Sequence, residues 1–261
     1  MIRIEQLRFA WPNDSSDCLA LDHLEVPGGQ TLFLHGPSGS GKSTLLGLLA
    51  GVLLPRQGKV ELLGVDWASL PASGRDARRA DHVGYIFQQF NLLPYLSALD
   101  NVLLPCRFSA ARRARAAAAS TSVTPSLPLG EGRGEGASPA FAVRSAAQSL
   151  LQRVGLAQST WQRPASQLSV GQQQRVAAAR ALIGAPEVVI ADEPTSALDT
   201  ELRNSFLDLL LAQCRAAGST LVFVSHDRQL AARFDVQVSL AELNHANFHA
   251  NFHGQAAKAS A

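Results

Sequence analysis

Residues 36–44 read Gly36-Pro37-Ser38-Gly39-Ser40-Gly41-Lys42-Ser43-Thr44, and the interpretation of the whole chain starts from this stretch. It fits the pattern of a glycine, four residues and then Gly-Lys-Ser/Thr. The apolar run Thr31–His35 precedes it and predicts a buried strand, while Leu45–Ala50 predict a helix that ends near Gly51. A strand, a glycine-rich turn and a helix in this order predict a phosphate-binding loop.

The residue types in this loop suit a nucleoside triphosphate. Glycines allow successive backbone N–H groups to turn toward an anion, and the helix N-terminus adds a partial positive charge. Lys42 suits contact with the β- and γ-phosphates, and the Ser43 hydroxyl suits Mg²⁺, with Thr44 one step further into the same turn. The alternative is an ordinary Gly/Ser loop, which the two flanking elements disfavour.

Composition limits the class of protein. The chain has 261 residues, 46 % of them hydrophobic, and a formal net charge of +2, which is too small to argue for nucleic acid or an anionic membrane surface. Its three cysteines, Cys18, Cys106 and Cys214, show no metal or redox spacing and suit a reducing compartment. The N-terminus lacks a signal peptide, and the run Leu45–Leu54 is shorter than the ~20 residues of a membrane span. We therefore expect a soluble, cytoplasmic chain that serves a membrane only through a partner.

Apolar runs alternate with helical segments along the chain. Val83–Phe87, Val188–Ala191 and Thr220–Val224 predict buried strands, and the first thirty residues predict strands and turns. A capping box at Ser97 predicts a helix that ends at about Leu104, before Pro105. Alternating strands and helices predict an α/β protein with a parallel core.

Two segments differ in composition from the rest of the chain, and both are predicted to be disordered. Residues 110–142 are rich in Arg, Ala, Ser, Pro and Gly, and we predict a disordered insertion whose removal (residues 115–140) leaves activity largely intact. Residues 241–261 predict a disordered tail. Its His245, His249 and His253 are spaced by four, so a metal-binding helix face is the alternative to an unstructured tail.

A pair of carboxylates, Asp192-Glu193, directly follows the predicted strand Val188–Ala191. Parallel α/β folds bind their ligands at the carboxyl ends of the strands. Asp192 suits the coordination shell of Mg²⁺, and Glu193 suits polarising a water for attack on the γ-phosphate. Taken alone, the pair could equally be an exposed acidic strand end.

A second anion site is predicted where Leu168-Ser169-Val170-Gly171-Gln172 opens a long helix. Ser169 and Gln172 form a capping box, so a helix N-terminus is displayed beside a hydroxyl. The segment has no lysine of its own, and the alternative is simply a well-capped helix.

Six motifs in one order resemble the ATP-binding subunit of an ABC transporter, over roughly residues 1–235 without the insertion. They are Gly36–Thr44, Gln88, Leu168–Gln172, Asp192-Glu193, Ser196-Ala197-Leu198-Asp199 and Ser225-His226-Asp227. The resemblance implies a P-loop NTPase (RecA-like) parallel-sheet core with an N-terminal antiparallel β subdomain and an inserted α-helical subdomain. The ATP-binding domain is expected over residues 1–240, with its helical subdomain at about 89–180.

The resemblance also implies a role for each matching residue. Trp11 stacks on adenine, Gln88 links the Mg²⁺ and water site to a transmembrane partner, and His226 contacts the γ-phosphate. Two copies sandwich two ATP molecules head to tail. Asp199 communicates across this dimer, and Ser169, Gly171 and Gln172 of one copy close over the nucleotide held by Lys42 of the other. Catalysis is thus assigned to Glu193, His226 and Gln88, and the metal to Ser43, Gln88 and Asp192.

The stretch Gly84–Val102 is similar to the branch of lipoprotein-releasing, macrolide-export and cell-division ATP-binding subunits. This similarity implies an ATPase that drives an integral-membrane permease from the inner face of the cell membrane, for export or extraction of a lipophilic or lipoprotein substrate. A mechanotransmission or regulatory subunit without solute transport is an alternative. A non-transport ATPase acting on DNA or ribosomes would bring a coiled coil or two ATP domains, so no nucleic acid is expected. Val170 departs from the family, which has glycine there.

Overall fold

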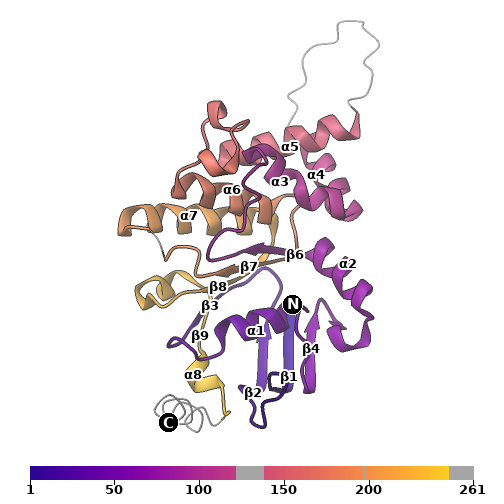
Figure 1. The fold of residues 1–261 in the computed structure, drawn as a ribbon, viewed down its shortest axis with the longest axis vertical. Helices are drawn as coiled ribbons and strands as arrows, with labels where there is room; N and C mark the ends of the chain where they lie inside the picture. The colour runs from indigo at the N-terminus through magenta and orange to yellow at the C-terminus, as the bar shows by residue number, and fades with distance from the viewer. Residues whose placement is uncertain (122–137, 197, 247–261) are drawn as a thin grey trace, which may run out of the picture. The chain divides into compact units, whose positions relative to one another are not determined.

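A computed structural model of the chain describes residues 1–121, 138–196 and 198–246. The chain divides into two compact units. The first comprises Met1–Asp76 and the segment that begins at Val222, and the second comprises Ala77–Leu221. Figure 1 labels the elements of both units along the chain.

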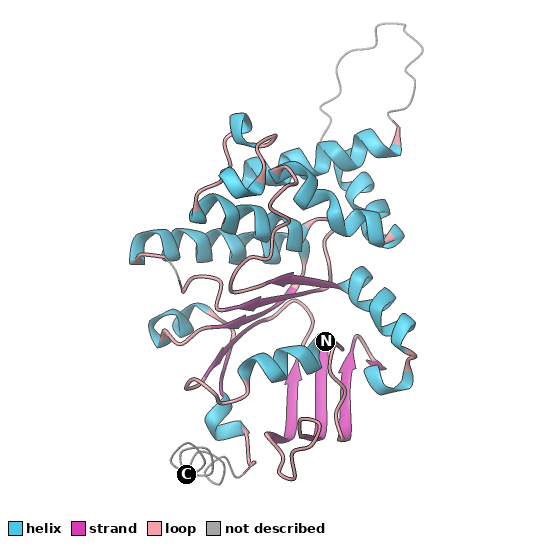
Figure 2. Ribbon diagram, viewed as in Figure 1, coloured by secondary structure: helices cyan, strands magenta, loops and turns pink. Residues whose placement is uncertain are grey.

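The first unit contains a four-stranded antiparallel sheet of order β2-β1-β4-β5 (Figure 2). Its strands are β1 (Ile2–Phe9), β2 (Leu19–Val26), β4 (Gln57–Leu62) and β5 (Val65–Asp66). Ile4 pairs with Leu24 on one side and Val60 on the other, and all three are buried. The alternation of buried and exposed residues along β1 therefore places one face of this sheet on the core, as predicted for an N-terminal antiparallel β subdomain.

The first unit also holds strands of the parallel sheet, in the order β8-β3-β9. These are β8 (Thr220–Val224), which begins at the end of the second unit, β3 (Thr31–His35) and β9 (Val236–Ser239). Leu32 and Leu34 of β3 pair in parallel with Val236 and Val238. Helix α1 (Lys42–Leu49) starts within the predicted phosphate loop, at Lys42, and packs on β4. Helix α8 (Leu240–Leu243) follows β9.

In the second unit, β6 (Val83–Ile86) pairs in parallel with β7 (Val188–Asp192), and β8 follows β7 in the sheet order. Val188–Ala191 are completely buried, which explains why this strand reads as an unbroken apolar run. The parallel core and the mixed α/β class are confirmed.

Among the described residues, six helices of eleven or more residues follow or flank these strands. They are α2 (Ala72–His82), α3 (Ala98–Phe108), α4 (Ala110–Thr121), α5 (Pro139–Arg153), α6 (Val170–Leu182) and α7 (Thr200–Ala217). Within the second unit, α6 contacts β6, α3, α5 and α7, and α4 lies along α5 (Figure 1). Helix α6 is therefore the central helix of this unit.

The predicted disordered insertion at 110–142 is wrong at both ends. Helix α4 covers its first twelve residues and α5 starts at Pro139, while residues 122–137 lie outside the described residues. The alanines of α4 favour a helix. Its arginines make buried hydrogen bonds that composition does not reveal, because Arg112 and Arg115 bind the backbone of a distant segment.

The predicted end of α3 before Pro105 is also wrong, because the helix continues to Phe108. Pro105 removes one N–H from the helix interior, which normally costs stability. Its own carbonyl nevertheless accepts from the Ser109 N–H at 3.0 Å, and Cys106 is buried in the core. Tertiary packing of the last turn outweighs the local preference.

The tail predicted at 241–261 is partly ordered. Residues up to Leu243 form α8, and Asn244 binds the edge of β2, donating to the Cys18 carbonyl at 3.0 Å and accepting from the Ala20 N–H at 2.8 Å. His249 and His253 of the alternative metal site lie outside the described residues. No cluster of His, Cys, Asp or Glu suited to a metal ion occurs within residues 1–121, 138–196 and 198–246. Over the same ranges, no helix has the length and apolar character of a membrane span.

Candidate functional site

The phosphate loop joins β3 to α1 in the first unit, as predicted. Gly39 and Gly41 have φ angles of +76° and +93°, a region that residues with side chains rarely adopt. A Cβ at Gly41 would also lie 2.7 Å from Leu19 Cδ2. Glycine is therefore required at Gly41 by both backbone conformation and space.

The loop has the features expected of a phosphate site. Gly41 has no side chain to cap α1, so the N–H groups of the first turn are directed at the loop. The hydroxyl oxygen of Ser40 is buried and has no hydrogen-bond partner among the described residues. Phosphate oxygens accept hydrogen bonds from such donors, so the residues present fit a nucleotide phosphate.

Lys42 lies folded over the loop. Its side chain is buried, and Nζ donates to the carbonyls of Gly36 at 2.9 Å and Pro37 at 3.0 Å. The ammonium group is thus held against the backbone of the loop that it serves. Ser43 is exposed at the start of α1, and Thr44 is half-buried one residue further along the helix.

Two other predicted residues lie in the first unit. The N–H of Ser225 donates to the Leu34 carbonyl at 3.2 Å, which brings the end of β8, and with it the exposed His226, beside the end of β3. Trp11 lies in the loop between β1 and β2, is 45 % exposed, and meets Phe9 edge to face at 5.3 Å. Since Phe9 is buried, Trp11 rather than Phe9 is available to stack on a base.

The acidic pair ends β7 in the second unit. Asp192 is its last residue, and Glu193 has a φ of +43°, which is unfavourable for a residue with a side chain. Burial raises the pKa of the Tyr85 phenol well above its usual range, and the charge of Asp192 adds to this. The phenol on β6 therefore remains protonated near this end of the sheet.

Gln88 is brought to the same edge of the sheet as Asp192. Ile86, two residues before Gln88, pairs with Ala191, the residue before Asp192. Parallel strands end side by side, so the turns after β6 and β7 are neighbours. Gln88 is exposed, and oxygen ligands from these two side chains suit Mg²⁺.

The capping box at the start of α6 is confirmed. The Ser169 hydroxyl accepts from the Gln172 N–H at 3.3 Å, and the Gln172 side chain accepts from the Ser169 N–H at 3.0 Å. An open cavity of about 500 Å³ is lined by this segment and by Asp199, which itself caps α7. Val170 and Gly171 line the same cavity, and the Val170 side chain is half exposed. Ala197, between the predicted Ser196 and Asp199, lies outside the described residues.

The structure therefore places the predicted residues in three groups. Trp11, Gly36–Thr44 and His226 belong to the first unit, and Gln88, Asp192 and Glu193 form one group in the second. The third group, also in the second unit, contains the exposed start of α6 and Asp199.

Sequence reasoning missed two residues that hydrogen-bond to the turns beside the second group. The Gln174 side chain donates to the Pro194 carbonyl, and Arg180 donates to the carbonyls of Phe90 and Asn91. Both lie on α6. The run Gln172-Gln173-Gln174 carries no signal in sequence for which of its side chains faces the core.

Comparison with known proteins identifies the family. Residues 20–196 match the family model described as ABC transporter. The chain is 42 % identical over 212 residues to the uncharacterized ABC transporter ATP-binding protein YbbA of Escherichia coli K12, covering 81 % of each chain. It is 38 % identical over 247 residues to the lipoprotein-releasing system ATP-binding protein LolD of Novosphingobium aromaticivorans, covering 93 % of this chain and 96 % of that one.

A solved structure supports the same family assignment. The dimeric post-hydrolysis state of the ATP-binding cassette MJ0796, bound to ADP and Pi, matches with a TM-score of 0.72 and 30 % identity. The match covers 92 % of this chain and 94 % of that one. The resemblance drawn from the six motifs is thereby confirmed, and the chain belongs to the ABC transporter family as an ATP-binding subunit.

Proposed function

We propose that this ATP-binding subunit works as a head-to-tail dimer that drives an integral-membrane permease, for export or extraction of a lipophilic or lipoprotein substrate. The family membership establishes an ATPase with ATP and Mg²⁺ as its cofactors. The observation that carries the dimer is the start of α6, where a capped helix N-terminus opens on a surface cavity. The similarity to LolD, whose name refers to lipoprotein release, supports the substrate class.

In this proposal the first unit binds the nucleotide. Trp11 stacks on adenine, and the backbone N–H groups of the phosphate loop (Gly36, Ser38, Gly39, Ser40, Gly41 and Thr44) surround the phosphates, while Pro37, which has no N–H, only shapes the turn. Lys42 moves its ammonium from loop carbonyls to phosphate oxygens. Ser43, Gln88 and Asp192 would hold Mg²⁺, which when bound neutralises phosphate charge. The Lys42 ammonium is then hydrogen-bonded to loop carbonyls in the chain without nucleotide and to phosphate oxygens in the chain with nucleotide.

Glu193 and Gln88 of the second unit and His226 of the first unit supply the hydrolytic groups. Glu193 orients a water and accepts its proton as the water attacks the γ-phosphorus. His226 donates to the γ-phosphate, and Gln88 connects the site to the permease. Ser169, Gly171 and Gln172 of the second copy close the site, because a helix N-terminus stabilises the charge on the phosphate. Asp199 lines the same cavity and lies at the contact between the copies.

Replacing Glu193 tests the proposal. Glu193→Gln keeps the shape of the side chain but cannot accept a proton, so we expect ATP binding to persist while hydrolysis falls by a factor of about 10²–10⁴. The ATP-bound variant should then accumulate as a dimer. Light scattering with and without ATP measures the dimer, and phosphate release measures turnover.

Glu25→Gln, an equivalent change at an exposed position of β2, serves as the control and should behave as the wild type. Normal turnover by Glu193→Gln would contradict the assigned role. Enrichment of RNA or DNA with the purified chain, without a membrane protein, would contradict the coupling to a permease.

A further inference from the structure

Gln174 is a buried polar residue in the second turn of α6. Its side chain is 2 % exposed, and Nε2 donates to the carbonyl oxygen of Pro194 at 2.8 Å within the core. The helix that carries it begins at the Ser169 cap, five residues earlier. A buried amide is costly unless it is hydrogen-bonded, so this bond fixes the side chain.

The acceptor lies in the turn that carries Glu193. Pro194 follows Glu193 directly, and the turn closes with a hydrogen bond from the Ser196 N–H to the Glu193 carbonyl at 3.2 Å. The left-handed backbone of Glu193, with φ of +43°, is less favourable than an ordinary conformation for a residue with a side chain. Such a conformation persists only where the surroundings hold it, and the bond from Gln174 is one of these restraints.

The same helix also holds the turn after β6. Arg180 Nη1 donates to the Asn91 carbonyl at 2.6 Å, and its Nη2 donates to the Phe90 carbonyl. Both acceptors have positive φ angles, and they follow Gln88 by two and three residues. Helix α6 therefore binds the backbone next to each of the two groups assigned to the hydrolytic site.

We propose that Gln174 is a positioning residue, which holds the turn after β7 so that the Glu193 carboxylate is aimed at the attacking water. The inference rests on the proposed role of Glu193. A methionine or leucine would fill the same space, so what the amide adds is its directed bond to Pro194. Through this bond, the helix that begins at Ser169 determines where Glu193 points.

Gln174→Met tests this directly, since it keeps the length of the side chain but removes the donor. A displaced catalytic group lowers kcat on the order of 10–100-fold. The KM for ATP should change by less than about threefold, because no residue of the phosphate loop is altered. Gln213→Met, the same change on α7 where Gln213 accepts from Arg153, is the matched control and should retain wild-type kcat.

Gln174→Glu gives a readout that packing alone would not produce. Burial raises the pKa of a carboxyl group, and its neutral form can donate an O–H to the Pro194 carbonyl, whereas its ionised form cannot. The ratio of its kcat to that of the wild type should be highest at low pH and fall as pH rises. A ratio that does not depend on pH would overturn the proposal.

A double variant separates this inference from the proposed function. If Gln174 acts through Glu193, adding Gln174→Met to Glu193→Gln should not lower residual hydrolysis further. Normal turnover by Glu193→Gln alone would defeat the role of Glu193 itself. A slow Glu193→Gln variant together with a fully active Gln174→Met variant would defeat only the positioning role. If Gln174→Met does not fold, the pH profile of Gln174→Glu decides.

Discussion

His35 is the last residue of β3 and directly precedes the phosphate loop. Its Nδ1 is buried without a hydrogen-bond partner among the described side chains and backbone. Burial lowers the pKa of the ring, the charge of Arg228 lowers it further, and Glu242 opposes both effects. The folded chain therefore resists protonation at this position more than the unfolded chain does.

This lowered pKa makes stability depend on pH. As the pH falls through about 6.5, the unfolded chain binds a proton at His35 before the folded chain does, so the free energy of unfolding decreases. His35→Gln removes this contribution, and we expect it to lose less stability than the wild type between about pH 7.5 and pH 5. Urea denaturation at several pH values measures the difference. Equal losses in the two proteins would contradict the prediction.

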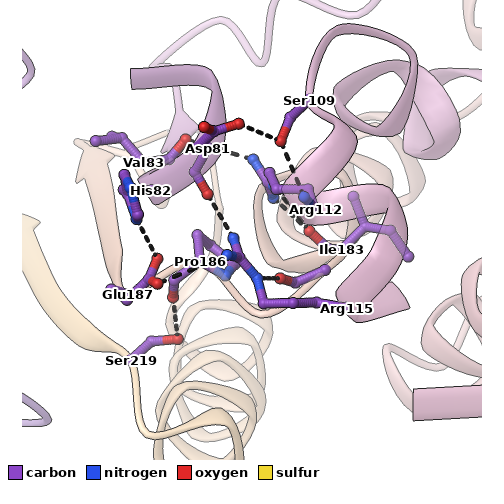
Figure 3. Close-up of polar contacts among 11 residues, drawn as sticks. Asp81, His82, Val83, Ser109, Arg112, Arg115, Ile183, Pro186, Glu187 and Ser219 are labelled. Atoms are coloured by element: carbon purple, nitrogen blue, oxygen red, sulfur yellow. Dashed lines mark hydrogen bonds and ion pairs between the residues drawn. The ribbon is translucent and has the colours of Figure 1, made fainter. Parts of the chain in front are cut away.

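At the scale of elements, the junction of α4 with the end of α6 shows how the second unit is held together (Figure 3). Arg112 is 2 % exposed, and its guanidinium donates to the carbonyls of Ala181 and Ile183 at 2.6 Å each. Arg115, one turn later, donates to Gly184 at 2.7 Å and faces Glu187, which also contacts His82. Helix α4 thus satisfies the carbonyl groups that α6 leaves unpaired at its C-terminal end.

Removing this guanidinium should destabilise the protein. Arg112→Met leaves buried carbonyls without donors, which costs about 3 kcal/mol. Chemical denaturation should show the loss as a lower midpoint without a change in slope. Arg113→Met, at the exposed neighbouring position of α4, is the control and should stay within about 0.5 kcal/mol of the wild type. An equal effect of both changes would show that the buried bonds contribute little.

Elements with a local signal were predictable from sequence. The start of α6 at Ser169 and the end of α1 near Gly51 were predicted because a capping box and a left-handed glycine act within one turn. Helix α4 was missed, because its order depends on bonds from Arg112 and Arg115 to carbonyls about 70 residues away. Composition carries no trace of such long-range partners.

The candidate site likewise contains residues that could be predicted from sequence and residues that could not. Its loop and acidic pair could be identified because phosphate binding requires fixed residue types at fixed spacing. The role of Gln174 could not be predicted, because its hydrogen bond to Pro194 arises only in the folded chain. The positive φ of Glu193 could not be predicted for the same reason. A glutamine within Gln172-Gln173-Gln174 gives no sign in sequence of which side chain faces the core.

At the scale of the whole molecule, the proposed dimer divides each site between two copies. Lys42 of one copy and Ser169 of the other serve the same nucleotide. Lys42 is buried against its own loop, whereas Ser169 is exposed beside an open cavity. A group that completes a site on another copy has to be exposed in the single chain, and Ser169 meets this requirement.

Mixing two inactive variants tests the arrangement. Lys42→Ala removes the phosphate-binding ammonium, and Ser169→Arg blocks the start of α6, so neither should hydrolyse ATP alone. In a 1:1 mixture, half of the dimers contain one copy of each, and every such dimer has one intact site. We expect recovery of about a quarter of wild-type phosphate release if the two sites act independently.

The control places both changes in one chain. A Lys42→Ala, Ser169→Arg double variant mixed with Lys42→Ala contains no intact site in any pairing, and should stay inactive. Failure of the first mixture to recover activity, with dimers present by light scattering, would show that Ser169 does not act across the dimer.

The contact of Asn244 with the edge of β2 has a consequence for solubility. β2 is the outer strand of the antiparallel sheet, and an outer strand presents unpaired backbone groups on which other chains can add. Asn244 occupies the Ala20 N–H and the Cys18 carbonyl, and the His245 N–H donates to the Ala20 carbonyl at 2.8 Å. The last described residues therefore cover part of this edge. A chain cut before Asn244 would expose these backbone groups to pairing with other chains, which promotes aggregation.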